Sequence, residues 1–147
     1  MPRRATLFLC LSLLAAGSAS ALDFVSVATP SSILYDAPSS KSRKMFVVSR
    51  YMPLEPVVSL KGWVKVRDSA GTLAWIEKDA LSEQRYVVVL PVLADVRSSP
   101  DTAAPLLFQA RQQVALAWLQ STGTGWIKVR SQDGAVGYIR TTEVWGD

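Results

Sequence analysis

The sequence predicts an all-β protein in which two small barrels follow one another after an N-terminal signal peptide. The main observation is a repeat: residues 62–81, GWVKVRDSAGTLAWIEKDAL, recur 63 positions later as residues 125–144, GWIKVRSQDGAVGYIRTTEV. Aligned without a gap, the two stretches share seven identical residues of 20. A second observation is that no amphipathic helical period extends beyond two turns in either copy, whereas short apolar runs alternate with turn residues. A duplicated block of strands follows from both.

Residues 1–21 have the three parts of a secretory signal peptide. Two arginines lie near the start, residues 7–16 form an apolar run too short to span a bilayer, and small residues lead up to Ala21. We therefore expect cleavage after Ala21 and a periplasmic or secreted product. The alternative is a lipoprotein acylated at Cys10, but Leu9 stands before this cysteine where a small residue is required.

The composition after the signal peptide excludes several classes of function. Two of the 16 basic residues lie in the signal peptide, which leaves 14 against 12 acidic residues and a net charge of +2. This is far from the concentrated positive charge of nucleic-acid-binding proteins. The mature chain has no cysteine and no histidine, so we expect no disulfide, no metal site of the common kinds and no cofactor. It also has no apolar run of the roughly 18 residues that a transmembrane helix needs.

The repeat extends over the whole mature chain. Upstream of the best match, at an offset of 62, Pro38 aligns with Pro100, Phe46 with Phe108 and Leu54 with Leu116. The predicted domains are therefore a signal peptide over 1–21, a first barrel over 22–84 and a second barrel over 85–147. The join at 82–85 is short, so we expect the two barrels to contact each other in a nearly fixed orientation.

Each unit contains the same elements in the same order. An opening strand is followed by a long loop, a central strand and a hairpin. The opening strands are expected at 23–28 and 85–96, the loops at 36–44 and 98–105, the central strands at 55–60 and 114–119, and the hairpins at 63–76 and 126–139. The loops are too rich in Pro, Ser and Ala for regular structure, and the hairpin turns carry Asp or Ser before Gly.

The first strand of each hairpin shows why these segments are strands. Val64 and Val66 alternate with polar or amphipathic residues, which is the period-two pattern of a strand with one apolar face. About five such strands in roughly 60 residues suit a small closed barrel, which leaves no long exposed sheet edge. A unit of this size is close to the smallest that one core stabilises, so contact between the units would help.

The segments ILYDAPS and GWVKVRDSAGTLAWIEKDAL of the first unit resemble bacterial SH3-like domains, and ADVRSSPD with GWIKVRSQDGAVGYIRTTEV resembles them more closely. The resemblance covers nearly all of the mature chain and is greatest to tandem secreted SH3 domain-containing proteins. It implies an SH3-like barrel for each unit. In that family such modules are attached to peptidoglycan hydrolases whose catalytic Cys and His lie in a separate domain, so the resemblance implies a binding module alone here.

The proline-binding groove of eukaryotic SH3 domains is incomplete in both units. In the first unit Tyr35 and Trp63 match the family positions, but Glu77 and Ala80 replace the Pro and the final Tyr. In the second unit only Trp126 is kept, and the other three positions are occupied by Arg97, Arg140 and Glu143. We therefore expect no binding of proline-rich peptides in the familiar way.

The candidate ligand-binding residues form a stripe that is repeated in both units. Strand alternation places its members on one face, opposite the valines, and the members are Trp63, Lys65 and Arg67 in the first unit and Trp126, Lys128 and Arg130 in the second. Tyr35 joins the first set. An aromatic ring beside two cations could stack on a sugar while pairing with carboxylates of an acidic stem peptide. The alternative is that Trp covers the barrel end while Lys and Arg form a solvated face.

We predict a non-catalytic, exported binding module that engages peptidoglycan or a cell-wall-associated protein. The alternative is a structural partner of another envelope protein through the surface between the barrels. No catalytic residue is expected, because the residue types for nucleophilic or acid–base catalysis are largely missing.

Overall fold

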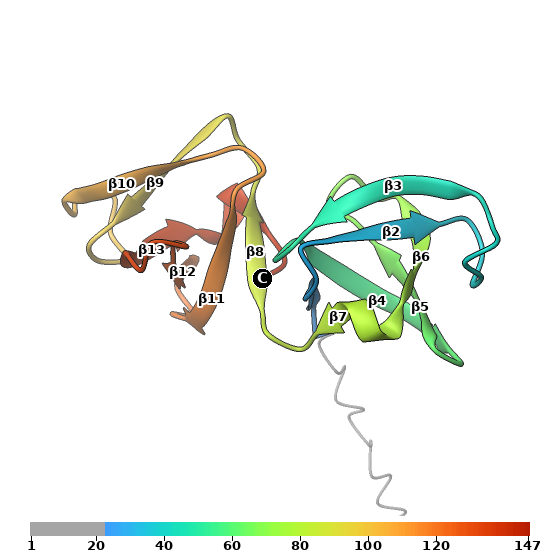
Figure 1. Cartoon of the computed structure of the whole chain (residues 1–147). Helices are drawn as coiled ribbons and strands as arrows, with labels where there is room; N and C mark the ends of the chain where they lie inside the picture. Colours follow the sequence, from blue (N-terminus) through green and yellow to red (C-terminus); the bar gives the residue numbers. More distant parts are fainter. Residues whose placement is uncertain (1–22) are drawn as a thin grey trace, which may run out of the picture.

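The computed structural model describes residues 23–147, so the predicted signal peptide and Cys10 lie outside the described residues. The described chain forms two antiparallel sheets of seven strands each (Figure 1). The strands of the first sheet precede residues 83–85, and those of the second follow them. The predicted all-β fold with two tandem barrels is confirmed. None of the helices in the part described is long and apolar enough to cross a membrane.

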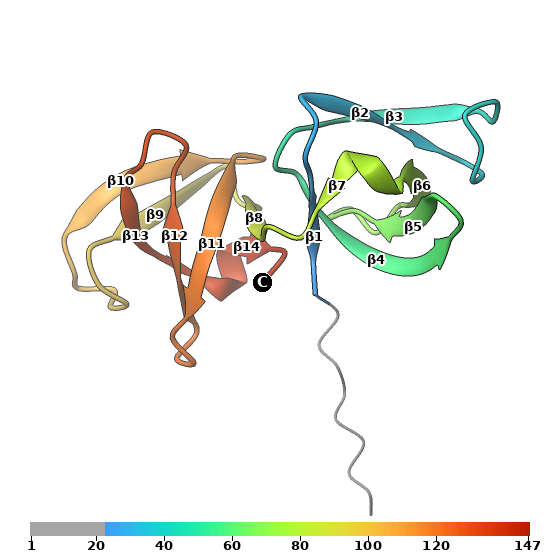
Figure 2. The same cartoon turned by 60° about the horizontal axis from the view of Figure 1, so that its bottom comes forward.

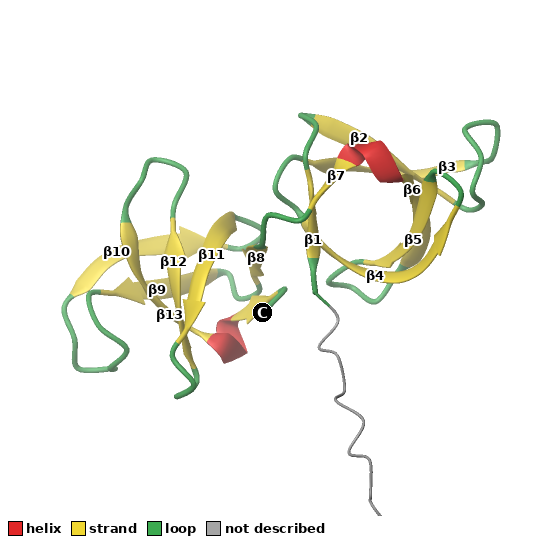
Figure 3. Cartoon of the chain, turned by 90° about the horizontal axis from the view of Figure 1, so that it is seen from below, coloured by secondary structure: helices red, strands yellow, loops and turns green. Residues whose placement is uncertain are grey.

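The first barrel has the strand order β3-β2-β6-β5-β4-β1-β7. Its elements are β1 (Val25–Val27), β2 (Ser31–Tyr35), β3 (Lys44–Ser49), β4 (Pro53–Leu60), β5 (Trp63–Arg67), β6 (Leu73–Glu77), the 3-10 helix η1 (Lys78–Ala80) and β7 (Leu81–Ser82). Viewed along its axis, the strands curl into a ring (Figure 3).

The second barrel repeats this arrangement in the order β10-β9-β13-β12-β11-β8-β14. Its elements are β8 (Tyr86–Val89), β9 (Leu93–Arg97), β10 (Leu106–Arg111), β11 (Ala115–Ser121), β12 (Trp126–Arg130), β13 (Val136–Arg140), the 3-10 helix η2 (Thr141–Glu143) and β14 (Val144–Trp145). The two orders correspond strand by strand, so the sequence repeat is a repeat of topology as well.

The hairpins form where the sequence predicts them, and turn chemistry explains their position. In β5–β6, Val64 pairs with Ile76 and Val66 with Ala74. The Asp68 carboxylate accepts hydrogen bonds from the backbone N–H groups of Ala70 and Thr72 at 2.9 and 2.8 Å. Such bonds hold a tight turn closed and stabilise the hairpin.

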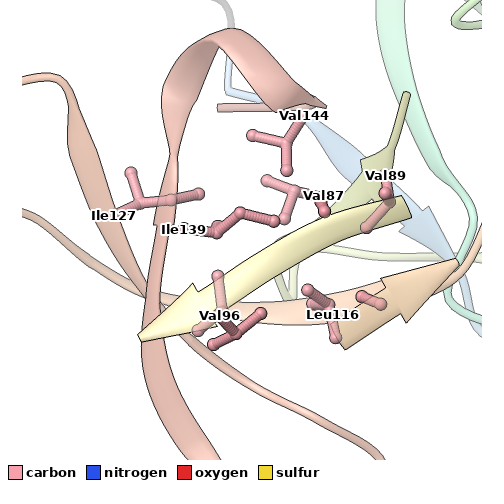
Figure 4. Close-up of a cluster of buried hydrophobic side chains, with 10 residues drawn as sticks. Val87, Val89, Val96, Leu116, Ile127, Ile139 and Val144 are labelled. Atoms are coloured by element: carbon pink, nitrogen blue, oxygen red, sulfur yellow. The ribbon is translucent and has the colours of Figure 1, made fainter. Parts of the chain in front are cut away.

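Aliphatic side chains from every part of a unit form one core in each barrel. The fully buried members of the second core include Val87, Val89, Val96, Leu116, Ile127 and Ile139, with Val144 closing one end (Figure 4). The first core is also built mainly of aliphatic side chains, and its fully buried members include Val27, Leu34, Leu54, Val66 and Ile76. The inward-facing residues are Val64 and Val66 on β5 and Ile127 and Val129 on β12. The predicted inward face of each strand is therefore confirmed.

Aromatic contacts join the two barrels. The rings of Tyr51 and Tyr86 stack with centroids 4.6 Å apart, and Phe24 meets Trp145 edge to face at 4.9 Å. Figure 2 shows β14 and the C-terminus on the side of the second barrel that faces β1. The buried Ser26 hydroxyl also donates a 2.7 Å hydrogen bond to the Gln84 carbonyl in the join. The two barrels are therefore in contact, as the short join predicts.

One glycine in the second core allows no side chain. A Cβ at Gly137 would lie 2.7 Å from Cγ1 of Val96 and 2.9 Å from the Arg97 carbonyl oxygen. The aligned position of the first barrel holds Ala74, which is buried there. The barrels therefore differ in how closely β13 and β6 approach their neighbouring strands.

We expect Gly137→Ala to lower the free energy of unfolding by about 1–3 kcal/mol, because the added methyl group overpacks a dense core. Urea denaturation followed by circular dichroism measures the change. The matched variant is Ala74→Gly, which opens a small void instead of creating a clash. A Gly137→Ala protein as stable as the wild type would contradict the close packing at this position.

Burial at the contact between the barrels raises the pKa of Tyr86 above its ordinary value of 10.0, and the neighbouring Tyr51 raises it further, while Arg130 lowers it. Since the folded-state pKa exceeds the unfolded one, the stabilising contribution is fully present below the unfolded-state pKa. It is lost as the pH rises through the folded-state pKa. We expect wild-type stability to fall more steeply above pH ~10 than that of Tyr86→Phe. Urea midpoints measured across this range test this, and equal slopes would contradict it.

Candidate functional site

The first barrel has a hollow of about 390 Å³ between β2 and η1. It is lined by Thr29, Ser31, Ser32, Ile33, Tyr35, Glu77, Asp79 and Ala80. The lining combines hydroxyl groups, one buried aromatic ring and two exposed carboxylates. This composition suits a polar ligand that presents hydrogen-bond donors.

Two of the predicted site residues meet at this hollow. Tyr35 and Trp63 contact each other edge to face, with ring centroids 5.4 Å apart. Tyr35 lies on β2 and lines the hollow, whereas Trp63 begins β5 and pairs across the sheet with Glu77. Trp63 is half-buried and does not itself line the hollow, so it reaches the hollow through its contact with Tyr35.

The second barrel has a hollow of about 320 Å³ at the corresponding place, between β9 and η2. It is lined by Asp95, Arg97, Thr102, Trp126, Arg140, Thr142 and Glu143. The Arg140 guanidinium lies over the Trp126 ring, 5.3 Å from its centroid. This is cation–π geometry, and it holds Arg140 against the wall of the hollow.

Arg97 and Asp95 form a fixed part of that wall. Nη2 of Arg97 lies 2.6 Å from one Asp95 oxygen, and Nη1 donates to the Ala104 carbonyl at 2.9 Å. The other Asp95 oxygen accepts a 2.9 Å hydrogen bond from Gln109. The charges of this pair therefore neutralise each other, and its hydrogen-bonding groups are largely used within the wall.

The two hollows occupy equivalent positions in the two barrels. The offsets that align the units bring Ile33 onto Asp95 and Tyr35 onto Arg97, and they bring Glu77, Asp79 and Ala80 onto Arg140, Thr142 and Glu143. Each of these pairs lines its own hollow. The repeat therefore preserves the position of the hollow while it changes the charge.

The remaining residues of the stripe do not gather at the hollows. Lys65 lies 6.0 Å from the ring centroid of Trp75, its cross-strand partner. Arg67 forms a 3.0 Å ion pair with Glu55 at the far end of β5. These two residues and Trp63 share one strand face, but only Trp63 approaches the first hollow.

The second copy of the stripe divides in a similar way. Trp126 lines the hollow, and Lys128 pairs across the sheet with Tyr138. Arg130 lies at the contact between the barrels, where it lines a space of about 220 Å³ with Tyr51 and Tyr86. The stripe thus runs along the strand, with Trp126 at the hollow and Arg130 at the contact between the barrels.

Sequence reasoning missed several lining residues. Ser31, Ser32 and Thr29 carry no distinctive pattern, and neither do Asp79 and Thr142 on the short 3-10 helices. The signal that could identify them is the repeat itself, because aligned positions with opposite charge, such as Glu77 and Arg140, stand out against the shared core residues.

A further hollow of about 950 Å³ in the second barrel is a groove along β10, lined mainly by apolar residues but also by Gln109, Arg111 and Asp133. Ala110 and Val114 line it. The aligned residues of the first barrel are Val48 and Met52, which pack against the core. The groove thus reflects smaller side chains in one copy, and it is not part of the repeated surface.

Within residues 23–147 no group of three or more His, Cys, Asp or Glu side chains is placed to hold a metal ion. The Asp133 carboxylate lies in the β12–β13 turn, where the Ser131 hydroxyl donates to it and lowers the pKa of Asp133 below its ordinary value. The Ser131 hydroxyl also accepts a 3.0 Å hydrogen bond from the backbone N–H of Ala135, so Ser131 takes the role that Asp68 has in the turn of the first barrel.

Three solved structures are similar to the chain. NlpC2 and NlpC1 from Trichomonas vaginalis are each 17% identical to it with a TM-score of 0.40, and an NlpC/P60 family protein from Bacillus cereus ATCC 10987 is 13% identical with a TM-score of 0.38. They align with 85%, 93% and 83% of this chain, which covers 48%, 51% and 55% of theirs. The chain therefore spans about half the length of each. No curated protein matches the sequence.

Two family models match the sequence, and both describe a bacterial SH3 domain. One matches residues 29–83 and the other residues 92–144. Bacterial SH3 domains are in general non-catalytic binding modules and are typically extracellular or associated with the cell wall. The two matches together cover most of the chain and fall one on each barrel, so the protein belongs to the bacterial SH3 domain family and contains two such domains in tandem.

Proposed function

We propose that this protein is an exported, non-catalytic module that binds peptidoglycan through the hollows between β2 and η1 and between β9 and η2. The observation that carries the proposal is the repetition of one polar hollow at the same place in both barrels, each beside the Trp that begins β5 or β12. Two linked sites suit a polymer with repeating units, because binding at one site raises the effective concentration at the other.

The chemistry of the linings supports a glycan with peptide substituents. In the second hollow the half-buried Trp126 provides aromatic surface for sugar rings or aliphatic side chains, and in both hollows the hydroxyl, carboxylate and guanidinium groups provide the directional contacts. The alternative of a protein partner on the surface between the barrels has less support, because Tyr51, Tyr86 and Trp145 already contact aromatic rings of the chain itself there.

Co-sedimentation with purified sacculi tests the proposal. Ser31→Trp and Thr142→Trp each place a large ring at the rim of one hollow, from positions that are exposed and therefore tolerant of substitution. We expect wild-type protein to pellet with sacculi, either single variant to pellet less, and the double variant to stay in the supernatant. Ser40→Trp, in an exposed loop outside both hollows, is the matched control and keeps wild-type binding.

The loss in each single variant should already be large, since linked sites bind up to about 10²- to 10⁴-fold more tightly than one alone, and the double variant should lose the remaining binding. Wild-type protein that stays entirely in the supernatant would contradict binding to the wall. Equal pelleting of the double variant and the control would place the binding surface elsewhere.

A further inference from the structure

The hollows of the two barrels differ in charge although they share one position. The first contains two carboxylates, Glu77 and Asp79, and no cationic side chain. The second contains two arginines and two carboxylates. At the ends of β6 and β13, Glu77 of the first copy aligns with Arg140 of the second. The second barrel therefore offers a ligand cationic groups that the first does not.

In the second hollow, Arg97 and Asp95 satisfy each other within the wall, which leaves one cation and one carboxylate facing the space. These are Arg140 and Glu143. Neither forms an ion pair within residues 23–147, so their charged groups are more than 4.0 Å apart from each other. Arg140 is held by the Trp126 ring, and Glu143 is partly buried on η2.

A separated cation and carboxylate in one hollow complement a ligand with the opposite two charges. The exposed Thr102 and Thr142 add hydroxyl groups to the same rim. An ammonium group would be attracted to Glu143 and a carboxylate to Arg140, whose planar guanidinium suits carboxylate recognition. A purely anionic ligand would face repulsion from Glu143, and a purely cationic one would face repulsion from Arg140.

We propose that the hollow of the second barrel, between Arg140 and Glu143, binds a zwitterionic amino-acid group that carries a free ammonium and a free carboxylate. This inference rests on the proposed function, since stem peptides of peptidoglycan are a source of such groups. The first barrel does not share the specificity, because Glu77 occupies the position of Arg140 in its hollow.

Alanine and its two blocked forms are probes for this site. Alanine is zwitterionic, N-acetylalanine carries only the carboxylate, and alaninamide carries only the ammonium. We expect titrations of the full mature chain, followed by amide and indole chemical shifts in NMR, to show alanine binding at Trp126, Arg140 and Glu143. Both blocked probes are expected to bind about two- to fivefold more weakly, as the loss of one solvent-accessible charge pair predicts.

Charge-neutralising variants separate recognition from general effects on the fold. Arg140→Gln should remove the advantage of alanine over alaninamide, and Glu143→Gln should remove its advantage over N-acetylalanine. Glu83→Gln, at an exposed carboxylate outside both hollows, is the matched control and should leave alanine binding unchanged. Equal binding of the three probes, or alanine shifts that map to the first hollow, would overturn the proposal.

Sacculus binding distinguishes the two proposals. If the sacculi retain the protein but alanine shows no preference at the second hollow, the zwitterion site is wrong and wall binding stands. If alanine binds as predicted but sacculi do not retain the protein, the site is real and the wall is not its target.

Discussion

Replacing Ile139 by alanine is expected to lower the free energy of unfolding by about 2–5 kcal/mol. Its side chain is fully buried at the centre of the second core, where it pairs across the sheet with Ile127 (Figure 4). Residues 23–147 contain no cysteine and thus no disulfide to offset the loss, so the cavity acts on the whole stability of the barrel. Urea denaturation followed by tryptophan fluorescence and circular dichroism measures the change.

The control for this variant is Val136→Ala in the same strand, where the valine is 39% exposed and its truncation should cost less. Ile76→Ala makes the same change at the aligned position of the first barrel. If Ile139→Ala lowers the free energy of unfolding by less than the Val136→Ala control does, the second core does not depend on Ile139.

The second large effect is expected at the contact between the barrels. Removing both aromatic pairs with Phe24→Ala and Tyr51→Ala should let the two barrels reorient independently. Each pair contributes about 0.5–1.5 kcal/mol beyond its buried area. Residual dipolar couplings measure this: one alignment tensor should fit both barrels of the wild type, and two different tensors should be needed for the double variant.

Phe46→Ala is the matched control for the double variant, because Phe46 is an aromatic residue of the first barrel that is 49% exposed on β3. It should keep a single tensor. Two tensors in the wild-type protein would contradict a fixed orientation, and a single tensor in the double variant would assign the rigidity to the join itself, including the bond from Ser26 to Gln84.

A fixed orientation bears on the proposed binding, because two linked sites cooperate only when their geometry lets both engage one target. The double variant therefore also tests the link between structure and function. Sacculus binding should weaken when the barrels reorient freely, even though neither hollow has been changed.

The repeat explains why so much of this fold could be predicted. Val64 and Val66 in one copy and the aligned residues Ile127 and Val129 in the other occur at period two, and that period alone places them inside. The Asp and Gly residues at the turns act over a few bonds, so their effect is visible in the sequence. Both hairpins therefore lie where the pattern predicts.

Strands β3 and β10 were not predicted, and their exposure explains the failure. The residues of β3, KMFVVS, have no alternation, because most of this strand is exposed and only Met45 and Val48 are half-buried. It forms by pairing with β2, and β10 likewise forms by pairing with β9. Pairing of that kind depends on a partner strand and leaves little hydrophobic period in the strand itself.

The candidate site shows the same division. The sequence by itself determined the duplicated barrels and the strand faces, and its resemblance to SH3 domains placed Tyr35 and Trp63 at one groove. Only the tertiary structure decided that Arg67 and Arg130 lie away from the hollows, that Arg140 lies against Trp126, and that η1 and η2 form the opposite walls. Local patterns report which way a side chain points along its own strand, whereas a hollow depends on segments far apart in the chain that meet only when the barrel closes.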